Sequence, residues 1–265
     1  MSFGVPAAFT ALLWWFATGT ILLLVRRPTR TYRVSILCAS ALLGLALTVM
    51  KLCASVTTTA SAYGAFACAL LVWAWLEITF LTGYLTGPQK TDCAPRLAGW
   101  PRFIAAARTV IHNELAMLAC GLGIVAVTWG AANRTALWTY LILWGMRLSA
   151  KLNLFFGVPN LGESFLPAHL AYLKSYFRRR SMNPLLPVSL AAAAALTLAM
   201  ARRYYSAKVG FDATASALLA TLLALGTLEH MFMVLPMASE RLWNYFGVTS
   251  SAVGGGGEPA SDVDG

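Results

Sequence analysis

Five charged side chains stand inside long apolar stretches of this chain, where charges are rarely found. They are Glu77, Glu114, Arg147, Lys151 and Glu229. A charge in hydrocarbon costs roughly a few kcal/mol unless it is paired or hydrated, so these residues are the first candidates for chemistry. Their acids and bases nearly balance, which suits ion pairing, acid–base chemistry or the binding of a polar group on an apolar ligand.

Arg147 and Lys151 are four residues apart and therefore share one face of a helix. Two cations on one stripe require counter-ions, and the candidates are Glu77, Glu114 and Glu229. By residue count, most of these charges lie roughly 8–14 Å from the inner ends of their segments, at about 1.5 Å per residue. The sequence predicts a polar layer there, which either fixes helix packing or forms a ligand or partner site.

Three histidines and an asparagine are candidate contacts for a pigment or other ligand: His112, His169, His230 and Asn153. His230 is followed by Met231-Phe232-Met233, and such a soft surface beside an imidazole suits a pigment, haem or quinone ring. A packing role for each histidine stays open. His112 and Glu114 point to different helix faces, and no acid–histidine spacing predicts a metal centre.

The elements that must position these residues are membrane helices. Hydrophobic residues make up 58% of the chain and charged residues 11%, and mean hydropathy is +0.67. Runs long enough to cross a bilayer lie at Pro6–Val25, Val34–Leu52, Ala62–Leu85, His112–Gly130, Thr135–Phe156, Pro184–Ala201 and Asp212–Met237. We therefore expect an all-α, polytopic membrane protein of about seven transmembrane helices, with residues 1–253 as one domain. The sixth run is the least hydrophobic.

The distribution of Lys and Arg predicts an outside N-terminus and an inside C-terminus. With that orientation the inward loops hold thirteen basic residues and the outward loops five. The first run is followed by arginines and lacks a positive leader, so it reads as a retained helix rather than a secretory signal. The net charge of +10 is then explained by topology and anionic lipid, without a nucleic-acid partner.

The inward loop 157–183 predicts an amphipathic helix on the cytoplasmic side. Pro167 suits a first turn, and apolar residues follow at helical spacing with basic residues at the end. Such a helix lies in the headgroup layer and either anchors the loop to lipid or docks another membrane protein. The candidate docking residues are Asn160, Glu163, Phe165, Tyr172, Arg178, Arg179 and Arg180.

Other segments carry little chemistry. The five cysteines are scattered without a CxxC pair, so neither a disulfide framework nor a zinc site is expected. The Gly-rich, acidic tail 254–265 has nothing to bury and is expected to be disordered.

The run from Trp144 to Leu170, which contains Arg147, Lys151, Asn153 and Asn160, resembles the PuhE family of photosynthetic-complex assembly proteins of purple bacteria. The continuation to Ser189, together with His112-Asn-Glu114-Leu and Leu228-Glu229-His230, resembles it too. The resemblance implies a bacterial inner (intracytoplasmic) membrane protein encoded near the reaction-centre H subunit. Its implied partners are reaction-centre or light-harvesting subunits, other assembly factors and membrane lipids. It carries over no catalytic residue.

Three functions compete. The first is a non-enzymatic assembly factor that docks a photosynthetic subunit and influences bacteriochlorophyll supply. The second is a membrane enzyme acting on a pigment, quinone or isoprenoid, with Glu77, Glu114, Glu229 or His230 as acid or base. No nucleophile–base pair or nucleotide loop is visible for it. The third is a pigment carrier using His230 or His169 as the magnesium ligand. The sequence favours the first.

Overall fold

The computed structural model describes residues 3–162, 166–207 and 209–235, and this part of the chain is all-α, as predicted. Its long helices are α1 (Gly4–Val25), α2 (Tyr32–Ala54), α3 (Thr59–Leu81), α4 (Gly99–Val127), α5 (Thr135–Phe156), α6 (Leu185–Ala207) and α7 (Phe211–Phe232). Two 3₁₀ helices, η1 (Thr29–Thr31) and η3 (Ala168–Tyr176), lie between them.

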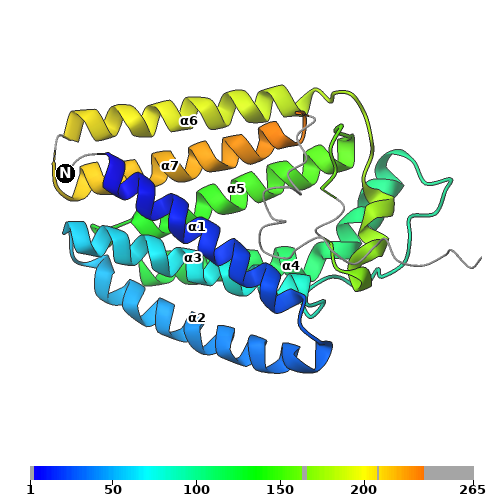
Figure 1. Ribbon diagram of the computed structural model, residues 1–265, viewed down its shortest axis with the longest axis horizontal. Helices are drawn as coiled ribbons and strands as arrows, with labels where there is room; N and C mark the ends of the chain where they lie inside the picture. The colour runs from blue at the N-terminus through cyan, green and yellow to red at the C-terminus, as the bar shows by residue number, and fades with distance from the viewer. Residues whose placement is uncertain (1–2, 163–165, 208, 236–265) are drawn as a thin grey trace, which may run out of the picture.

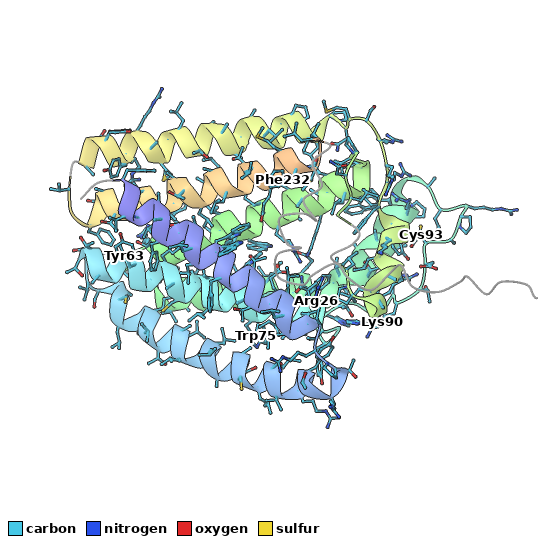
Figure 2. All side chains as sticks on the ribbon, viewed as in Figure 1. Arg26, Tyr63, Trp75, Lys90, Cys93 and Phe232 are labelled. Carbon is cyan, nitrogen blue, oxygen red and sulfur yellow. The ribbon has the colours of Figure 1, made fainter. Side chains whose placement is uncertain are left out.

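The long helices lie side by side, and α3, α5 and α7 form the centre of the bundle (Figure 1). α2 covers α3 on one side and α6 covers α7 on the other. η3 lies at one end of the bundle, which we call the η3 end, and the N-terminus lies at the opposite end. Figure 2 places Lys90 and Cys93 at the η3 end and Tyr63 at the opposite end.

Small residues allow the central helices to approach closely. Ala62, Ala65 and Ala69 of α3 are all almost fully buried, as is usual where helices pack without a hydrophobic driving force between them. The largest core cluster joins α2, α3, α4 and α5 and includes Met50 and Tyr140. Because the phenol of Tyr140 is buried, it needs a partner, and it donates a hydrogen bond to the carbonyl of Met117 at 2.6 Å.

Two buried asparagines tie helix ends together. The side-chain oxygen of Asn133 accepts from the N–H of Thr135 at the start of α5, and its amide donates to the carbonyls of Cys53 and Ser61. Asn183 caps α6 by accepting from Leu185 and Leu186, and it donates to the carbonyl of Gly157. Each asparagine therefore caps one helix and holds a second element against it.

Six of the helices in the described residues are long and apolar enough to cross a membrane. The expected sixth run, which looked weak in sequence, is the 23-residue α6 and meets this condition. α5 does not, because it carries Arg147, Lys151 and Asn153 among its apolar residues. We treat α5 as the seventh span because it packs against both α3 and α7 inside the bundle.

One expected helix start and one expected helix type were wrong. α4 begins at Gly99, thirteen residues before the expected start at His112, so Arg102 and Arg108 lie on a helix instead of a loop. The amphipathic loop segment is helical but winds as the 3₁₀ helix η3, in which Leu170, Leu173 and Tyr176 are buried at intervals of three. The tail 254–265, Met237, Glu163 and Phe165 fall outside the described residues.

Candidate functional site

Both cations of α5 are paired with acids from other helices. The Nη2 atom of Arg147 lies 3.0 Å from Oε2 of Glu77 on α3. The Nζ atom of Lys151 lies 2.6 Å from Oε1 of Glu114 on α4 and donates a hydrogen bond to it. The two ion pairs thus join α5 to two neighbouring helices, α3 and α4.

Phe80 lies between the two cations. The guanidinium carbon of Arg147 is 5.6 Å and the ammonium of Lys151 is 5.5 Å from the centre of its ring. An aromatic face attracts cations electrostatically, so the ring gives both of them a second favourable contact away from water. Phe80 follows Glu77 by three residues on α3, which places the acid and the ring on the same face.

Both ion pairs line a cavity of about 470 Å³, which we call the ion-pair cavity. α3, α4 and α5 form its walls, and Leu173, Tyr176 and Phe177 of the η3 segment cover it. Its other lining side chains are mostly apolar, so the cavity combines a hydrophobic volume with four charges on one side. This volume lies within the range of small-molecule sites.

A second cavity of about 240 Å³ lies on the other side of the Glu77–Arg147 pair, between α1, α3, α5 and α7. Glu229 lines this cavity, which we call the Glu229 cavity, but it makes neither ion pair in the described residues. Glu229 shares this cavity with both members of that pair. Of the three candidate counter-ions, Glu77 and Glu114 therefore make ion pairs, and Glu229 is the one that does not.

Several buried polar atoms of α4 and α5 have no hydrogen-bond partner among the described residues. Nε of Arg147 and Nε1 of Trp144 on α5, and Oδ1 of Asn113 on α4, belong to this set. Buried donors and acceptors are nearly always satisfied by protein or by ordered water. Of these three atoms, Nε of Arg147 belongs to a residue that lines the ion-pair cavity, where water or a polar ligand group would satisfy it.

His230 belongs to a separate polar cluster. Its Nδ1 lies 2.9 Å from the carbonyl of Gly226, which can only accept, so Nδ1 carries the proton. Its Nε2, 2.9 Å from Oγ of Ser149, then accepts from that hydroxyl. The amide of buried Asn153 donates to the carbonyl of Ser149 at 2.9 Å and lies 3.2 Å from Oγ of Ser189. Ligation of a metal by His230 would require the loss of one of these hydrogen bonds.

The other two histidines lie at the η3 end of the bundle. Nε2 of His169 lies 2.8 Å from the carbonyl of Leu81, and its ring is 6.3 Å from that of Tyr32. A Cβ on Gly83 would come within 3.1 Å of this imidazole, so glycine leaves room for it. His112 is exposed on α4 and, unlike Glu114, does not line the ion-pair cavity. The three histidines therefore lie in three different surroundings.

The η3 segment is attached to the bundle by both apolar and polar contacts. Leu170 and Leu173 pack on Phe80. The phenol of Tyr176 donates to the carbonyl of Thr91 at 3.1 Å and accepts from the amide of Gln89 at 3.3 Å. Burial raises the pKa of Tyr176, against a smaller opposite effect of the Gln89 hydrogen bond, so the phenol keeps its proton and remains a donor.

Arg102 holds the same segment from α4. Its guanidinium donates to the carbonyl of Tyr176 at 2.5 Å and to that of Phe155 at 3.4 Å. It also lies 4.5 Å from the centre of the Phe155 ring. Arg102 is almost fully buried, with 4% of its surface exposed. Arg102 therefore joins α4, α5 and η3. No sequence pattern indicated this role, because Arg102 stood in an expected loop.

The remaining docking candidates lie around the same end. The N–H of Arg178 donates to the carbonyl of Leu154, and Val158 forms an isolated bridge with Arg179. The amide of Asn160 donates to the carbonyls of Phe232 and Leu235 beyond α7. Tyr172 is half-buried beside Phe80, and Arg180 is exposed. The loop is therefore bound to α5 and α7 by its backbone and by Asn160.

The chain has relatives across almost its whole length. A family model described as "Protein of unknown function (DUF3623)" matches residues 1–252. A Rhodobacter capsulatus protein described as "Uncharacterized 30.4 kDa protein in puhA 5'region" is 36% identical over 244 residues, covering 90% of this chain and 89% of that protein. No solved structure matches the chain.

Proposed function

This chain belongs to the DUF3623 family of proteins of unknown function, and we propose that it is an assembly factor for the photosynthetic reaction centre and its core antenna in the bacterial inner membrane. The observation that carries the proposal is the description of its Rhodobacter capsulatus relative as a protein of the puhA 5' region. Proteins that build one complex are often encoded together, and the resemblance to the PuhE family implies a gene near that of the reaction-centre H subunit.

The geometry supports docking at the η3 end. Exposed side chains there include Trp100 and Met182, with 70% and 57% of their surfaces exposed, together with Arg180. Aromatic and basic residues of this kind mark a membrane–water boundary. Because η3 is fixed by Arg102 and Tyr176, it presents its outer residues in a defined plane to a membrane subunit, with little ordering entropy left to lose.

The ion pairs have a place in this function. η3 covers the ion-pair cavity, and Phe80 contacts both η3 and the two cations. Removing the pairs would loosen the helices on which η3 rests. The same cavity supports a second function, the handling of a lipid-soluble pigment, quinone or isoprenoid, since its volume is apolar apart from the two ion pairs.

A photocrosslinking experiment tests the docking surface. A photoreactive amino acid at Ala171, exposed on η3, is expected to crosslink to a reaction-centre or antenna subunit in phototrophic membranes. The same label at Tyr205, with 75% of its surface exposed at the opposite end, is the control. Equal crosslinking from both positions would argue against docking at η3.

A deletion strain separates the two functions. An assembly factor predicts fewer reaction centres, measured by membrane absorbance, with respiratory growth unchanged. An enzyme predicts instead one accumulated pigment or quinone precursor. Normal reaction-centre content in the deletion strain would refute the assembly proposal.

A further inference from the structure

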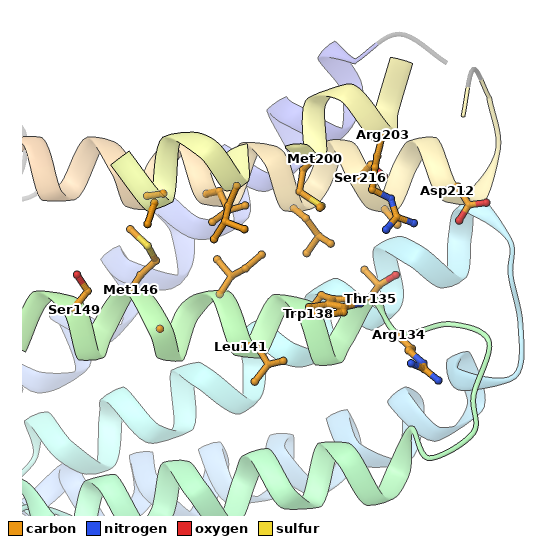
Figure 3. Close-up of a pocket in the computed structure, with 18 of the residues that line it drawn as sticks. Arg134, Thr135, Trp138, Leu141, Met146, Ser149, Met200, Arg203, Asp212 and Ser216 are labelled. Carbon is orange, nitrogen blue, oxygen red and sulfur yellow. The ribbon is translucent and has the colours of Figure 1, made fainter. Parts of the chain in front are cut away.

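A cavity larger than the ion-pair cavity lies apart from the ion pairs. It is a groove of about 790 Å³ between α5, α6 and α7 (Figure 3). Its walls include Trp138 and Met146 of α5, Leu196 and Met200 of α6 and Leu219 of α7. We call it the α6 groove. Nothing in the assembly function requires it.

The walls of the groove suit a hydrocarbon chain. α6 packs closely on α7 and only lightly on α5, so the groove is open along the α5 side. Gly145 lies in the wall, and a Cβ built on it meets nothing within 4 Å. A volume of this size, lined by flexible Met and Leu side chains, is an adaptable site for an acyl chain.

The two ends of the groove differ in their polar groups. At the end nearer η3, the Ser149 hydroxyl is already bonded to His230. At the opposite end, Arg134 and Arg203 line the groove from the start of α5 and the last turns of α6. Figure 3 shows the Arg203 side chain extending from α6 toward the space between the helices.

A buried hydroxyl marks the same end. Thr135, only 3% exposed, lines the groove, and its Oγ1 has no hydrogen-bond partner in the part of the chain that the structure describes. It is the first residue of α5, whose N-terminal N–H groups favour an anion. Asp212 also lines this end, at the first turn of α7. This end of the groove therefore has two guanidinium groups and one carboxylate. Its net charge is positive and complements an anion.

We propose that the α6 groove binds one anionic glycerophospholipid. One acyl chain lies along α6, and the phosphate is held by Arg134, Arg203 and the hydroxyl of Thr135. Charge complementarity at one end and an apolar wall along the rest fix both the type and the direction of the ligand. The site lies on the opposite side of α5 from the ion-pair cavity wall, so it acts independently of the docking surface.

Native mass spectrometry of the full chain in mild detergent tests this proposal. The probes are phosphatidylglycerol and phosphatidylcholine with identical acyl chains. Phosphatidylglycerol carries a net negative charge. Charge-assisted hydrogen bonds to its phosphate predict that it binds about tenfold more tightly than phosphatidylcholine. The double variant Arg134→Gln/Arg203→Gln is expected to lose that preference, whereas Arg202→Gln, on α6 outside the groove, keeps it.

Filling the groove tests the acyl chain. Gly145→Phe is expected to abolish tight binding of both lipids, and Gly123→Phe on α4, which also meets open space, is the matched control. Ala192→Phe, from the α6 wall, serves if the first variant does not fold. Equal affinity of the natural chain for both lipids, or undiminished binding by either filled variant, would overturn the proposal. So would a quinone or pigment in place of phospholipid in the purified protein.

Discussion

The Glu77–Arg147 pair allows a test in which the two single substitutions should have unequal effects. An unpaired carboxylate in hydrocarbon can lose its charge by binding a proton, whereas a guanidinium cannot. Glu77→Gln therefore leaves a permanent charge without its partner, and Arg147→Met leaves an acid that can be neutralised. The variant that keeps the arginine should be the less stable of the two.

The expected magnitudes follow from burial. Breaking a fully buried pair costs roughly 3–5 kcal/mol. Here the side chains of Arg147 and Glu77 are 28% and 13% exposed, and Glu229 offers a second carboxylate in the same cavity. We therefore expect about 2–3 kcal/mol for Glu77→Gln and about 1 kcal/mol for Arg147→Met. The double variant should recover about 1–2 kcal/mol relative to Glu77→Gln.

The assay is reversible unfolding of the purified protein in mixed micelles, followed by helical circular dichroism. The control is Arg33→Met, because Arg33 is exposed in the first turn of α2 and its substitution should change the unfolding free energy by less than about 0.5 kcal/mol. If the double variant is no more stable than Glu77→Gln, the two side chains do not act as a pair, and the reasoning fails.

Two further variants test backbone contacts by the same unfolding assay. Gly87→Ala would put a Cβ 2.0 Å from the carbonyl oxygen of Arg108, so it should destabilise the protein by about 2 kcal/mol. The control Gly123→Ala, in open space, should be neutral. Equal stability of the two variants would show that the turn at Gly87 is not held against α4. Asn183→Ala removes the α6 cap and the bond to Gly157 and should cost about 1–2 kcal/mol. An unchanged unfolding midpoint for this variant would mean that the cap contributes nothing.

The pairing of charges was predictable from the sequence, but the choice of partners was not. Two cations on one helix face in a membrane must find anions, so a polar layer followed from the energetics of burial alone. Three acids were available, and which of them pairs depends on the rotation of each helix about its axis. Glu229 shares a cavity with Glu77 and Arg147 but makes neither of the two ion pairs, and no pattern within α7 indicates which acid pairs.

The expected start of α4 and the expected helix type of η3 were wrong for a common reason. Hydropathy marks where a helix enters the membrane, whereas backbone helicity continues as long as hydrogen bonds are satisfied. Arg102 lowers the hydropathy before His112 without interrupting α4, and its charge is accommodated by carbonyls of Phe155 and Tyr176. In η3, apolar residues at 170, 173 and 176 fit a repeat of three as well as an α-helical face, and contact with Phe80 accompanies the tighter winding.

The hydrogen bond between Ser149 and His230 could not be predicted, because 81 residues separate the two. Each looked like an isolated polar residue on its own helix. The sequence showed no nucleophile close to a base along the chain, but sequence spacing does not exclude such a pair in the folded protein. The structure instead shows a serine hydroxyl bonded to an imidazole whose other nitrogen is held by a carbonyl, within a cluster that also contains Asn153.

The helix that fails the test of apolarity is also the one that positions the site. α5 carries both paired cations, Ser149 and Asn153, and it contacts α3, α4, α6 and α7. A helix with so many polar groups is stable in a bilayer only where neighbouring helices satisfy them, so its polarity and its central position require each other. The outer helices α2 and α6 face no such condition and can remain almost wholly apolar. For a membrane bundle of this kind, the long segment that carries several charged and polar residues is thus the best sequence indicator of the centre, and lipid-facing surfaces are expected on the outer helices.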